Sequence, residues 1–462
     1  MSAQLKAVLA HIDTNLDASL ERLFGLLRIP SISTDSKWKA DCAKAADWLK
    51  ADLETSGFKA SVRPTPGHPV VLGHAKGPAD KPHVLFYGHY DVQPVDPLEL
   101  WETSPFEPRL VEVSRGRKVI VARGACDDKG QVMTFLEACR AWHAVTGSLP
   151  VGVTALIEGE EETGSTHLPA FVKANAKELK ADFALVCDTG MWDRKTPAIT
   201  TSLRGILFQE LVIRCADRDL HSGSFGGAAA NPAHILARII ASFHKPNGKI
   251  AIPGFYDGVK NLPAKVKAGL ADLGLTEKEF LGAVGLKSSV GEKGRLLIEQ
   301  ITTRPTCDVN GIWSGYNGQG TKTVIAAEAH CKVSFRLVGE QDPVAIRKAF
   351  QAFVKAQVPK DCSVEFIDHG GSPAIQLPWD SAALKAAEAA LKQEWGTAPA
   401  LVGSGGSIPI VGDFKRTLGL DSLLVGYGLD DDRVHSPNEK YDLSSFHKGT
   451  RSWARILAAL AA

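Results

Sequence analysis

The sequence predicts an α/β fold with a mostly parallel sheet, interrupted by an inserted α+β domain. Short apolar runs alternate with helical patterns up to about residue 210, which is typical of a parallel sheet covered by helices. The pattern then changes to that of a small α+β domain, and the α/β pattern resumes near residue 379. We therefore expect a discontinuous main domain, residues 1–210 and 379–462, and an inserted domain, residues 211–378.

Four apolar runs in the main domain are too short to be lone helices, and we expect them to be strands. Longer amphipathic segments lie between and after them and predict helices, the first of which is closed by Gly57. The expected strands are "HVLFYGHYD" (83–91), "VGVTALIEGE" (151–160), "DFALVCDTG" (182–190) and "SLLVGYGL" (422–429), and the expected helices cover 40–57, 127–147, 381–396 and 444–460.

The inserted domain alternates helix and strand patterns. Asp342 before Pro343 is a good helix start signal, because the carboxylate caps the first turn and proline fits its first position. We expect helices in "NPAHILARIIASFHK" (231–245) and "DPVAIRKAFQAFVKAQV" (342–358), two strands or a hairpin in "TVIAAEAHCKVSFRLV" (323–338), and a strand in "CSVEFIDHG" (362–370).

The composition is that of an ordinary globular protein and argues against two classes of partner. Of the 462 residues, 53 are Lys or Arg and 52 are Asp or Glu, and we find no polybasic run. Nucleic acid or an anionic membrane is therefore not the expected partner. The N-terminal segment lacks the pattern of a signal peptide, and the eight cysteines form no CxxC pair, so we expect a reducing cytoplasm.

Acidic or imidazole side chains follow each of the four expected strands. The candidates are His89 and Asp91 after the first, Glu158 and Glu160–Glu162 after the second, Asp188 after the third, and Asp430–Asp432 with His435 after the last. The carboxyl ends of parallel strands line the ligand crevice of an open α/β sheet. A further pair, Asp127 and Asp128, stands where a loop enters a helix.

Each of these segments alone is typical of a turn, a helix cap or a solvated face. Together they would crowd carboxylates at one sheet edge, where the negative charges repel one another unless a cation is present. Histidine with carboxylate ligands suits zinc, with manganese or cobalt as alternatives. Five or more ligands exceed the needs of one catalytic zinc, so we expect two divalent metal ions per subunit.

The motifs resemble those of a known family. "GHYDVQP", "ARGACDDKG", "EGEEETG", "VCDTG" and "HSPNEK" are similar to motifs of the dinuclear zinc metallopeptidases that include carnosinase-type dipeptidases, carboxypeptidase G, acetylornithine deacetylase and aminoacylase. The similarity covers almost the whole chain. It implies a catalytic domain of the zinc-peptidase type with an inserted ferredoxin-like lid or dimerisation domain.

The resemblance assigns the metal ligands position by position. It implies that His89 and Asp188 bind one ion, that Glu162 and His435 bind the second, and that Asp127 bridges the two.

The resemblance also assigns supporting roles near the metals. It implies that Glu161 is the general base, that Asp91 orients His89, and that Asp128 shapes the loop without binding metal. In the implied reaction, Glu161 takes a proton from a water shared by two metals, the hydroxide attacks an amide carbonyl, and Glu161 returns the proton to the leaving amine.

Four further residues have implied roles in binding substrate. His221, in "DRDLHSGSFGG", resembles a histidine that enters the active site of the partner in a homodimer and stabilises the oxyanion. Arg336 resembles an arginine that grips the terminal carboxylate of the substrate, which a guanidinium fork suits. Thr323 and Ser407 resemble substrate contacts. Carnosinase-type enzymes carry an acid just before "GGS", where this chain has Ser404 and Gly405.

The leading hypothesis is a cytoplasmic, homodimeric dinuclear metallo-dipeptidase that hydrolyses dipeptides or very short peptides. An N-acyl amino acid amidohydrolase, such as a deacetylase or desuccinylase, is the alternative enzyme. A binding or scaffold protein that kept the fold is a third hypothesis. It is disfavoured because such a protein would usually have lost a ligand or the base, and His89, Asp127, Glu161, Glu162, Asp188 and His435 are all present.

Overall fold

The structure is a computed structural model that describes residues 2–405 and 408–462. The chain divides into two compact units, which are described separately below. Unit 1 comprises Met1–Thr201, Leu377–Val402 and Pro409–Ala462, and unit 2 comprises Ser202–Gln376 and Gly403–Ile408. The boundaries expected from the sequence were 210/211 and 378/379. No helix among the described residues is long and apolar enough to cross a membrane.

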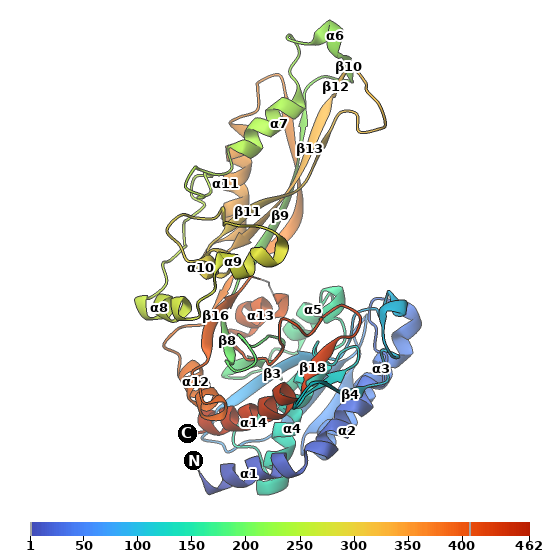
Figure 1. The fold of residues 1–462 in the computed structure, drawn as a ribbon, viewed down its shortest axis with the longest axis vertical. Coiled ribbons are helices and arrows are strands. Elements are labelled where there is room, and N and C mark those ends of the chain that lie inside the picture. Colours follow the sequence, from blue (N-terminus) through green and yellow to red (C-terminus); the bar gives the residue numbers. More distant parts are fainter. Residues whose placement is uncertain (1, 406–407) are drawn as a thin grey trace. The chain divides into compact units, whose positions relative to one another are not determined.

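Unit 1 contains most of a large mixed sheet, which confirms the α/β class (Figure 1). Its central strands β6, β3, β7 and β17 are parallel, and the outer strands pair antiparallel. The strands, in sheet order, are β1 (Lys59–Arg63), β2 (Val70–Ala75), β6 (Gly152–Glu158), β3 (His83–His89), β7 (Phe183–Val186), β17 (Ser422–Leu424), β8 (Ala198–Leu203) and β15 (Ile375–Gln376), with β16 (Ala400–Ser404) paired to β8.

Helices cover this sheet because its strands are apolar on both faces. The helices of unit 1 are α1 (Ala3–Thr14), α2 (Leu16–Leu27), α3 (Lys39–Thr55), α4 (Lys129–Thr146), α5 (Leu168–Ala174), α12 (Ala382–Trp395), α13 (Pro409–Asp413) and α14 (Leu443–Leu460). Helix α4 packs on β3 and against α14, and α3 packs on β1 and β2. The helices predicted at 40–57, 127–147, 381–396 and 444–460 are all confirmed.

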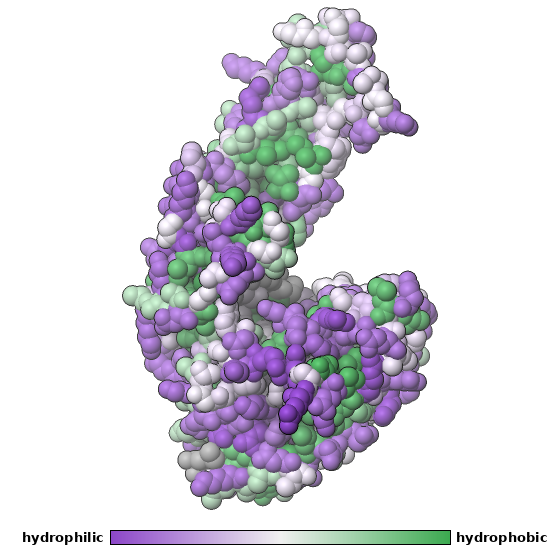
Figure 2. All heavy atoms as spheres, viewed as in Figure 1, coloured by the Kyte–Doolittle hydropathy of each residue, from purple (hydrophilic) through white to green (hydrophobic). Residues whose placement is uncertain are grey.

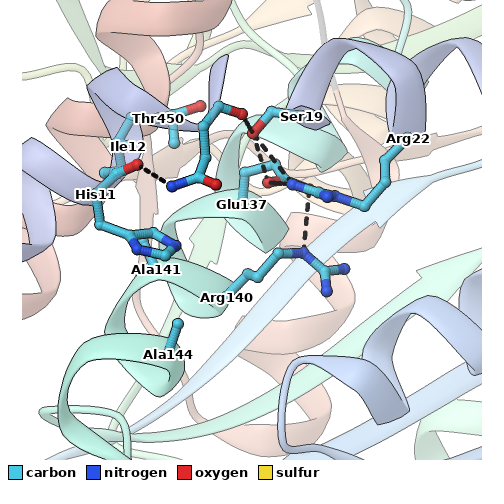
Figure 3. Close-up of a pocket in the computed structure, with 10 residues that line it drawn as sticks. His11, Ile12, Ser19, Arg22, Glu137, Arg140, Ala141, Ala144 and Thr450 are labelled. Atoms are coloured by element: carbon cyan, nitrogen blue, oxygen red, sulfur yellow. Dashed lines mark hydrogen bonds and ion pairs between the residues drawn. The ribbon is translucent and has the colours of Figure 1, made fainter. Parts of the chain in front are cut away.

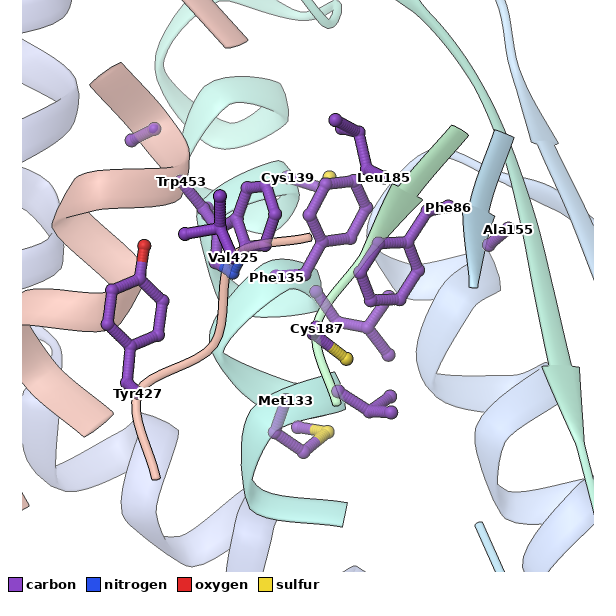
Figure 4. Close-up of a cluster of buried hydrophobic side chains, with 14 of the residues drawn as sticks. Phe86, Met133, Phe135, Cys139, Ala155, Leu185, Cys187, Val425, Tyr427 and Trp453 are labelled. Atoms are coloured by element: carbon purple, nitrogen blue, oxygen red, sulfur yellow. The ribbon is translucent and has the colours of Figure 1, made fainter. Parts of the chain in front are cut away.

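Aromatic side chains form the centre of the core of unit 1 (Figure 4). Phe86 of β3 stacks on Phe135 of α4 with ring centroids 3.7 Å apart, and Trp453 of α14 meets Phe135 edge-on at 5.3 Å. Tyr87 points to the other face of the sheet and meets Phe414 edge-on, as expected for alternate residues of a strand. This packing fixes β3, at whose end His89 lies.

A network of charged side chains joins three helices beside a cavity of about 170 Å³ (Figure 3). Glu137 of α4 accepts hydrogen bonds from Arg22 of α2 at 2.6 Å and from Ser19 at 2.7 Å. Arg140, one turn along α4, donates to Asp52 of α3 at 2.6 Å. The network therefore links α2, α3 and α4 across an interface that is otherwise apolar.

A small three-stranded sheet, in the order β18-β5-β4, lies beside α14. It consists of β4 (Arg109–Ser114), β5 (Arg117–Val121) and β18 (Lys440–Asp442), all antiparallel. The sequence analysis did not predict this sheet. It connects the segment that leads into Asp127 with the segment that follows His435.

Unit 2 is built on a four-stranded antiparallel sheet in the order β11-β13-β9-β14. In chain order its main elements are β9 (Gly205–Arg214), α7 (Pro232–Ala241), β11 (Thr306–Ser314), β13 (Glu328–Leu337), α11 (Pro343–Lys355) and β14 (Ser363–Ser372). This βαββαβ order with a first strand next to the fourth is the ferredoxin-like arrangement, which confirms the prediction. The Asp342 side chain caps α11 by accepting a hydrogen bond from the Val344 amide.

Unit 2 also contains shorter elements, which precede or follow β11 in the sequence. They are β10 (Leu220–His221), α6 (Ser222–Phe225), α8 (Ala264–Asp272), α9 (Glu277–Phe280), α10 (Leu297–Thr302) and β12 (Val324–Ile325). Strand β10 pairs with β12. Figure 2 shows apolar side chains gathered on unit 2 near α7 and β13, whereas the visible face of unit 1 is mostly polar.

Candidate metal centre

The parallel strands β6, β3 and β7 deliver acidic and imidazole groups to one edge of the sheet. His89 is the last residue of β3 and lies beside Glu158, the last residue of β6. Asp188 follows β7 by two residues. The expectation that these groups meet at the carboxyl ends of the strands is therefore confirmed.

Asp127 lies between two groups of candidate ligands. Its Oδ1 is 3.1 Å from Nε2 of His89, and its Oδ2 is 2.9 Å from Nε2 of His435. The His89 Nε2 atom is also 3.9 Å from a carboxylate oxygen of Asp188, and the His435 Nε2 atom is 3.2 Å from one of Glu162. The structure thus brings all five predicted ligands into two triads that share Asp127.

Asp91 contacts groups that belong to both triads. Nδ1 of His89 is 3.1 Å from the backbone carbonyl oxygen of Asp91 and 3.3 Å from its carboxylate, so Asp91 holds the imidazole with Nε2 directed at Asp127. The same carboxylate accepts hydrogen bonds from the backbone amides of Glu161 and Glu162, and from the Ser33 hydroxyl at 2.6 Å. One buried side chain therefore fixes a histidine of one triad and the backbone that carries Glu162 of the other.

Glu161 and Glu162 are neighbours with different surroundings. The carboxylate of Glu162 contacts His435 and accepts a hydrogen bond from Gln93 at 2.7 Å. Among the residues that the structure describes, none forms a hydrogen bond or ion pair with the carboxylate of Glu161. Glu161 is half-buried and remains available to a substrate or a water.

Glu439 holds the loop that carries Asp127, a role that the sequence analysis missed. Its carboxylate accepts hydrogen bonds from the amides of Gly124, Cys126 and Asp127 at 2.9–3.0 Å and pairs with Arg123 at 2.7 Å. The peptide bond between Asp127 and Asp128 is cis. The only sequence signal for Glu439 is its place in "HSPNEK", four residues after His435.

The Asp128 carboxylate contacts a backbone amide and a thiol beside the triads. It accepts a hydrogen bond from the His89 amide at 3.2 Å and one from the Cys187 thiol at 3.3 Å. Burial and the nearby Asp188 raise the pKa of Asp128 well above its ordinary value.

The His435 loop adopts unusual backbone conformations. Arg433, His435 and Asn438 have φ values of 56°, 63° and 59°, in the left-handed region that side chains disfavour. The Asn438 side chain fixes the loop by donating to the Leu100 carbonyl and accepting from the Glu102 amide. Such strain persists where the surrounding structure determines it, and it is frequent at functional sites.

The carboxylates of the site outnumber its positively charged side chains. Burial and the neighbouring Asp127 raise the pKa of Asp188 to about 7. Burial also opposes ionisation of Asp127, but hydrogen bonds from His435 and His89 hold its pKa below the usual range. Hydrogen bonds to Asp127 and Glu162 raise the pKa of His435 to about 10. The site therefore favours a positive charge beside each of the two carboxylate oxygens of Asp127.

Two divalent cations fit this donor set. Within each triad the nitrogen and oxygen atoms lie within 4.8 Å of one another, so that one ion between them could reach all three. Imidazole and carboxylate are the ligands that zinc, manganese and cobalt accept. A cavity of about 180 Å³ lies beside the site and is lined by Asp127, Asp188, Gly428 and Asp430, among other residues.

The remaining predicted residues belong to unit 2. His221 is exposed on β10, and the Ser222 amide donates a hydrogen bond to the carbonyl of Thr323, so these two positions are adjacent. Arg336 lies near the C-terminal end of β13, opposite Ile206 of β9 and Thr306 of β11. Ser407 lies outside the described residues.

Comparison with known proteins decides the family. The model of Peptidase family M20/M25/M40 matches residues 85–459. The chain belongs to this family. That match includes every predicted metal ligand, from His89 to His435.

Among M20 relatives, the Cys-Gly metallodipeptidase of Candida albicans is 32% identical over 453 residues, covering 94% of this chain and 92% of the relative. The human Beta-Ala-His dipeptidase is 30% identical over 406 residues, covering 85% and 78%. The solved structure of an M20 family metallo-carboxypeptidase from Sulfolobus solfataricus superposes with a TM-score of 0.78, at 32% identity and coverage of 96% and 99%.

Proposed function

We propose that this protein is a dinuclear metallodipeptidase that hydrolyses the amide bond of dipeptides or very short peptides. The observation that carries the proposal is the position of Glu161. Its carboxylate has no partner among the described residues, yet it directly precedes Glu162 and lies beside two candidate ligand triads that share Asp127. A metal site with an adjacent unengaged carboxylate is suited to hydrolysis.

His89, Asp188 and Asp127 would hold one ion, and Asp127, Glu162 and His435 the other. When bound, the ions would polarise the amide carbonyl and acidify the attacking water. We propose zinc, because two imidazoles and several carboxylates suit it and zinc has no redox chemistry that a hydrolase would have to suppress.

Glu161 is the proposed general base and acid. Its carboxylate accepts a proton from the attacking water and then delivers it to the nitrogen of the leaving amine. Asp91 supports the step by binding the amides of Glu161 and Glu162, which fixes the backbone of the base relative to the ligands. Glu161 can move a proton because Glu162, and not Glu161, is engaged with His435.

Unit 2 is proposed to supply the substrate contacts. Arg336 binds the terminal carboxylate of the peptide with its guanidinium fork. Among the described residues, no carboxylate lies within 4.0 Å of that guanidinium, so it has no competing ion pair. His221 donates a hydrogen bond to the developing oxyanion, and Thr323, whose backbone contacts Ser222, lies next to it.

His221 and Arg336 support a homodimer as the functional form. Strand β10 with His221 pairs with β12, which precedes β13, whereas Arg336 is near the end of β13. The eight residue steps from Glu328 to Arg336 alone span roughly 26 Å of extended strand. One peptide bond is too short to contact both residues of the same chain, so we propose that His221 acts in the site of a second copy.

The outer strand β11 offers a surface for that second copy. It carries large apolar side chains with high exposure, at 39% for Val309, 56% for Ile312 and 42% for Trp313. An exposed apolar edge strand is a template for pairing with another chain. The cysteines are free thiols, and we propose the cytoplasm as the compartment.

The test is a substrate panel with purified protein of measured metal content. The panel contains Cys-Gly, β-Ala-His, other dipeptides, tripeptides and N-acetyl amino acids, each with and without a chelator. We expect chelator-sensitive cleavage of dipeptides with about two metal ions per chain. Cleavage of N-acetyl amino acids with none of dipeptides would establish the amidohydrolase alternative.

The Glu161→Gln variant tests the proposed base. It removes the proton acceptor but keeps the shape, so turnover should fall by at least about a hundredfold while metal content stays unchanged. Glu178→Gln, on a partly exposed carboxylate paired with Arg63, is the matched control and should retain turnover. Turnover near the normal value in Glu161→Gln would remove Glu161 from its role.

A further inference from the structure

Two of the eight cysteines differ from the others. Cys42, Cys126, Cys139, Cys187, Cys307 and Cys331 are buried, whereas Cys215 and Cys362 are half-buried. The sulfur atoms of Cys215 and Cys362 are 2.8 Å apart, although 147 positions separate them in the sequence. No CxxC motif in the sequence marks this pair, because its proximity arises only from the strand pairing of unit 2.

The backbone places the two cysteines opposite each other. Arg214 at the end of β9 pairs with Ser363 at the start of β14, so Cys215 and Cys362 are the next cross-strand pair. The Cys215 amide donates to the Ala327 carbonyl on the β13 side, away from β14. The pair is therefore of the non-hydrogen-bonded kind, in which Cα atoms approach to about 4.5 Å, within the usual range for a disulfide.

We propose that Cys215 and Cys362 are a modification site at which a reversible disulfide forms, joining the end of β9 to the start of β14. Two features besides the distance support it. Both side chains are partly exposed, so that a small oxidant can reach them. Both residues also stand at strand ends, where the backbone is free of further β9–β14 ladder bonds and can adjust to the bond.

The oxidant is a low-molecular-weight disulfide such as oxidised glutathione. The thiolate of one of the two cysteines attacks one of its sulfurs, forming a mixed disulfide and releasing one thiolate. The sulfur of the other cysteine then attacks the protein sulfur of the mixed disulfide, and the second thiol leaves. The two cysteines lose two protons and two electrons, and the oxidant becomes two thiols.

The disulfide would close a long loop and fix the start of the segment that leads from β9 to β10 and His221. The turn after Cys215 is already held by Asp219, whose carboxylate accepts a hydrogen bond from the Ala327 amide. A cross-link beside this turn restricts the unfolded chain over almost the whole of unit 2. We expect the melting temperature of unit 2 to rise by about 5 °C or more on oxidation.

The test uses the whole chain of 462 residues and needs no peptidase activity, so its outcome is independent of the proposed function. The protein is equilibrated with oxidised glutathione, remaining thiols are alkylated, and peptides are mapped by mass spectrometry before and after dithiothreitol. We expect a single linked peptide pair containing Cys215 and Cys362, lost on reduction. Unlinked cysteines, stable glutathione adducts on both, or a different linked pair would overturn the proposal.

Variants provide a second measurement. Cys215→Ser and Cys362→Ser should each abolish the oxidation-dependent rise in melting temperature, because either removes one sulfur of the bond. Cys42→Ser, at a buried cysteine of unit 1, should keep the rise and serves as the matched control. A rise that persists in Cys215→Ser would assign the effect to another residue.

Discussion

Asp127 can serve two ions because its two carboxylate oxygens face different partners. One oxygen faces His89 and the other faces His435, at 3.1 and 2.9 Å. This division depends on backbone contacts, since Glu439 binds the amides of Cys126 and Asp127. The side chain of Asp127 therefore supplies the candidate metal-binding oxygens. The direction in which they point is fixed by Glu439, which is more than 300 positions away in the sequence.

The ligand candidates could be predicted from the sequence, and the residues that hold them could not. Imidazoles and carboxylates after apolar strands marked a wider set of candidates, and the resemblance to a known family singled out His89, Asp127, Glu162, Asp188 and His435. Glu439 binds backbone amides, which every residue has, so no pattern in the sequence reveals that it is needed. The left-handed backbone conformation of His435 could not be predicted either, because it concerns backbone atoms, which every residue has.

Asp91 gives a prediction at the scale of a single residue. Asp91→Ala should lower metal affinity by about 10- to 100-fold, because it removes the carboxylate from the His89 imidazole and from the Glu162 amide, although the backbone carbonyl of residue 91 still contacts His89. Competition with a chelator of known affinity measures the change. Asp80→Ala, at an exposed carboxylate, is the control, and equal affinity in the two variants would show that Asp91 does not position the ligands.

At the scale of elements, strands with strong apolar patterns were predictable and weakly patterned ones were not. The strands β3, β6 and β7 were recognisable from unbroken apolar runs, and α11 from its Asp-Pro start. The sheet β18-β5-β4 was missed because β18 has three residues and pairs with a strand about 320 positions earlier. Such pairing depends on the tertiary fold and leaves no local period in the sequence.

The charged network between α2, α3 and α4 gives a prediction about stability and pH. Burial outweighs the attraction of Arg140 and raises the pKa of Asp52 from its ordinary value of about 4 to about 6. The folded protein then holds this proton more tightly than the unfolded chain does. The stabilising contribution of protonated Asp52 is present at low pH and is lost as the pH rises from about 4 to about 6.

Asp52→Asn should remove this dependence, because the amide does not ionise. Urea denaturation at pH 4 and pH 7 measures it. Between these values the wild type should lose about 2 kcal/mol of unfolding free energy more than the variant does. Asp47→Asn, at an exposed position of the same helix, should follow the wild type. Parallel curves for wild type and Asp52→Asn would contradict the prediction.

At the scale of the whole molecule, the proposed exchange of His221 between subunits can be tested by complementation. Glu161→Gln and His221→Ala chains are co-expressed with different tags, and the mixed dimer is purified. One of its two sites would contain an intact Glu161 from one chain and an intact His221 from the other. The mixed dimer should therefore have about half of the wild-type activity, although both parents are nearly inactive.

The result separates two arrangements of the site. If both residues acted within one chain, each chain of the mixed dimer would carry a damaged site, and its activity would match that of the parents. A wild-type dimer prepared with the same two tags controls for the purification.

The position of β17 has a consequence for synthesis on the ribosome. This strand lies between β7 and β8 in the sheet, but its residues, Ser422–Leu424, follow the whole of unit 2 in the sequence. The edge of β7 therefore stays unpaired while more than 200 further residues are made, roughly 10 to 40 seconds at typical elongation rates. During that interval the emerging chain exposes an apolar strand edge, which makes chaperone binding to the nascent protein an expected step in its production.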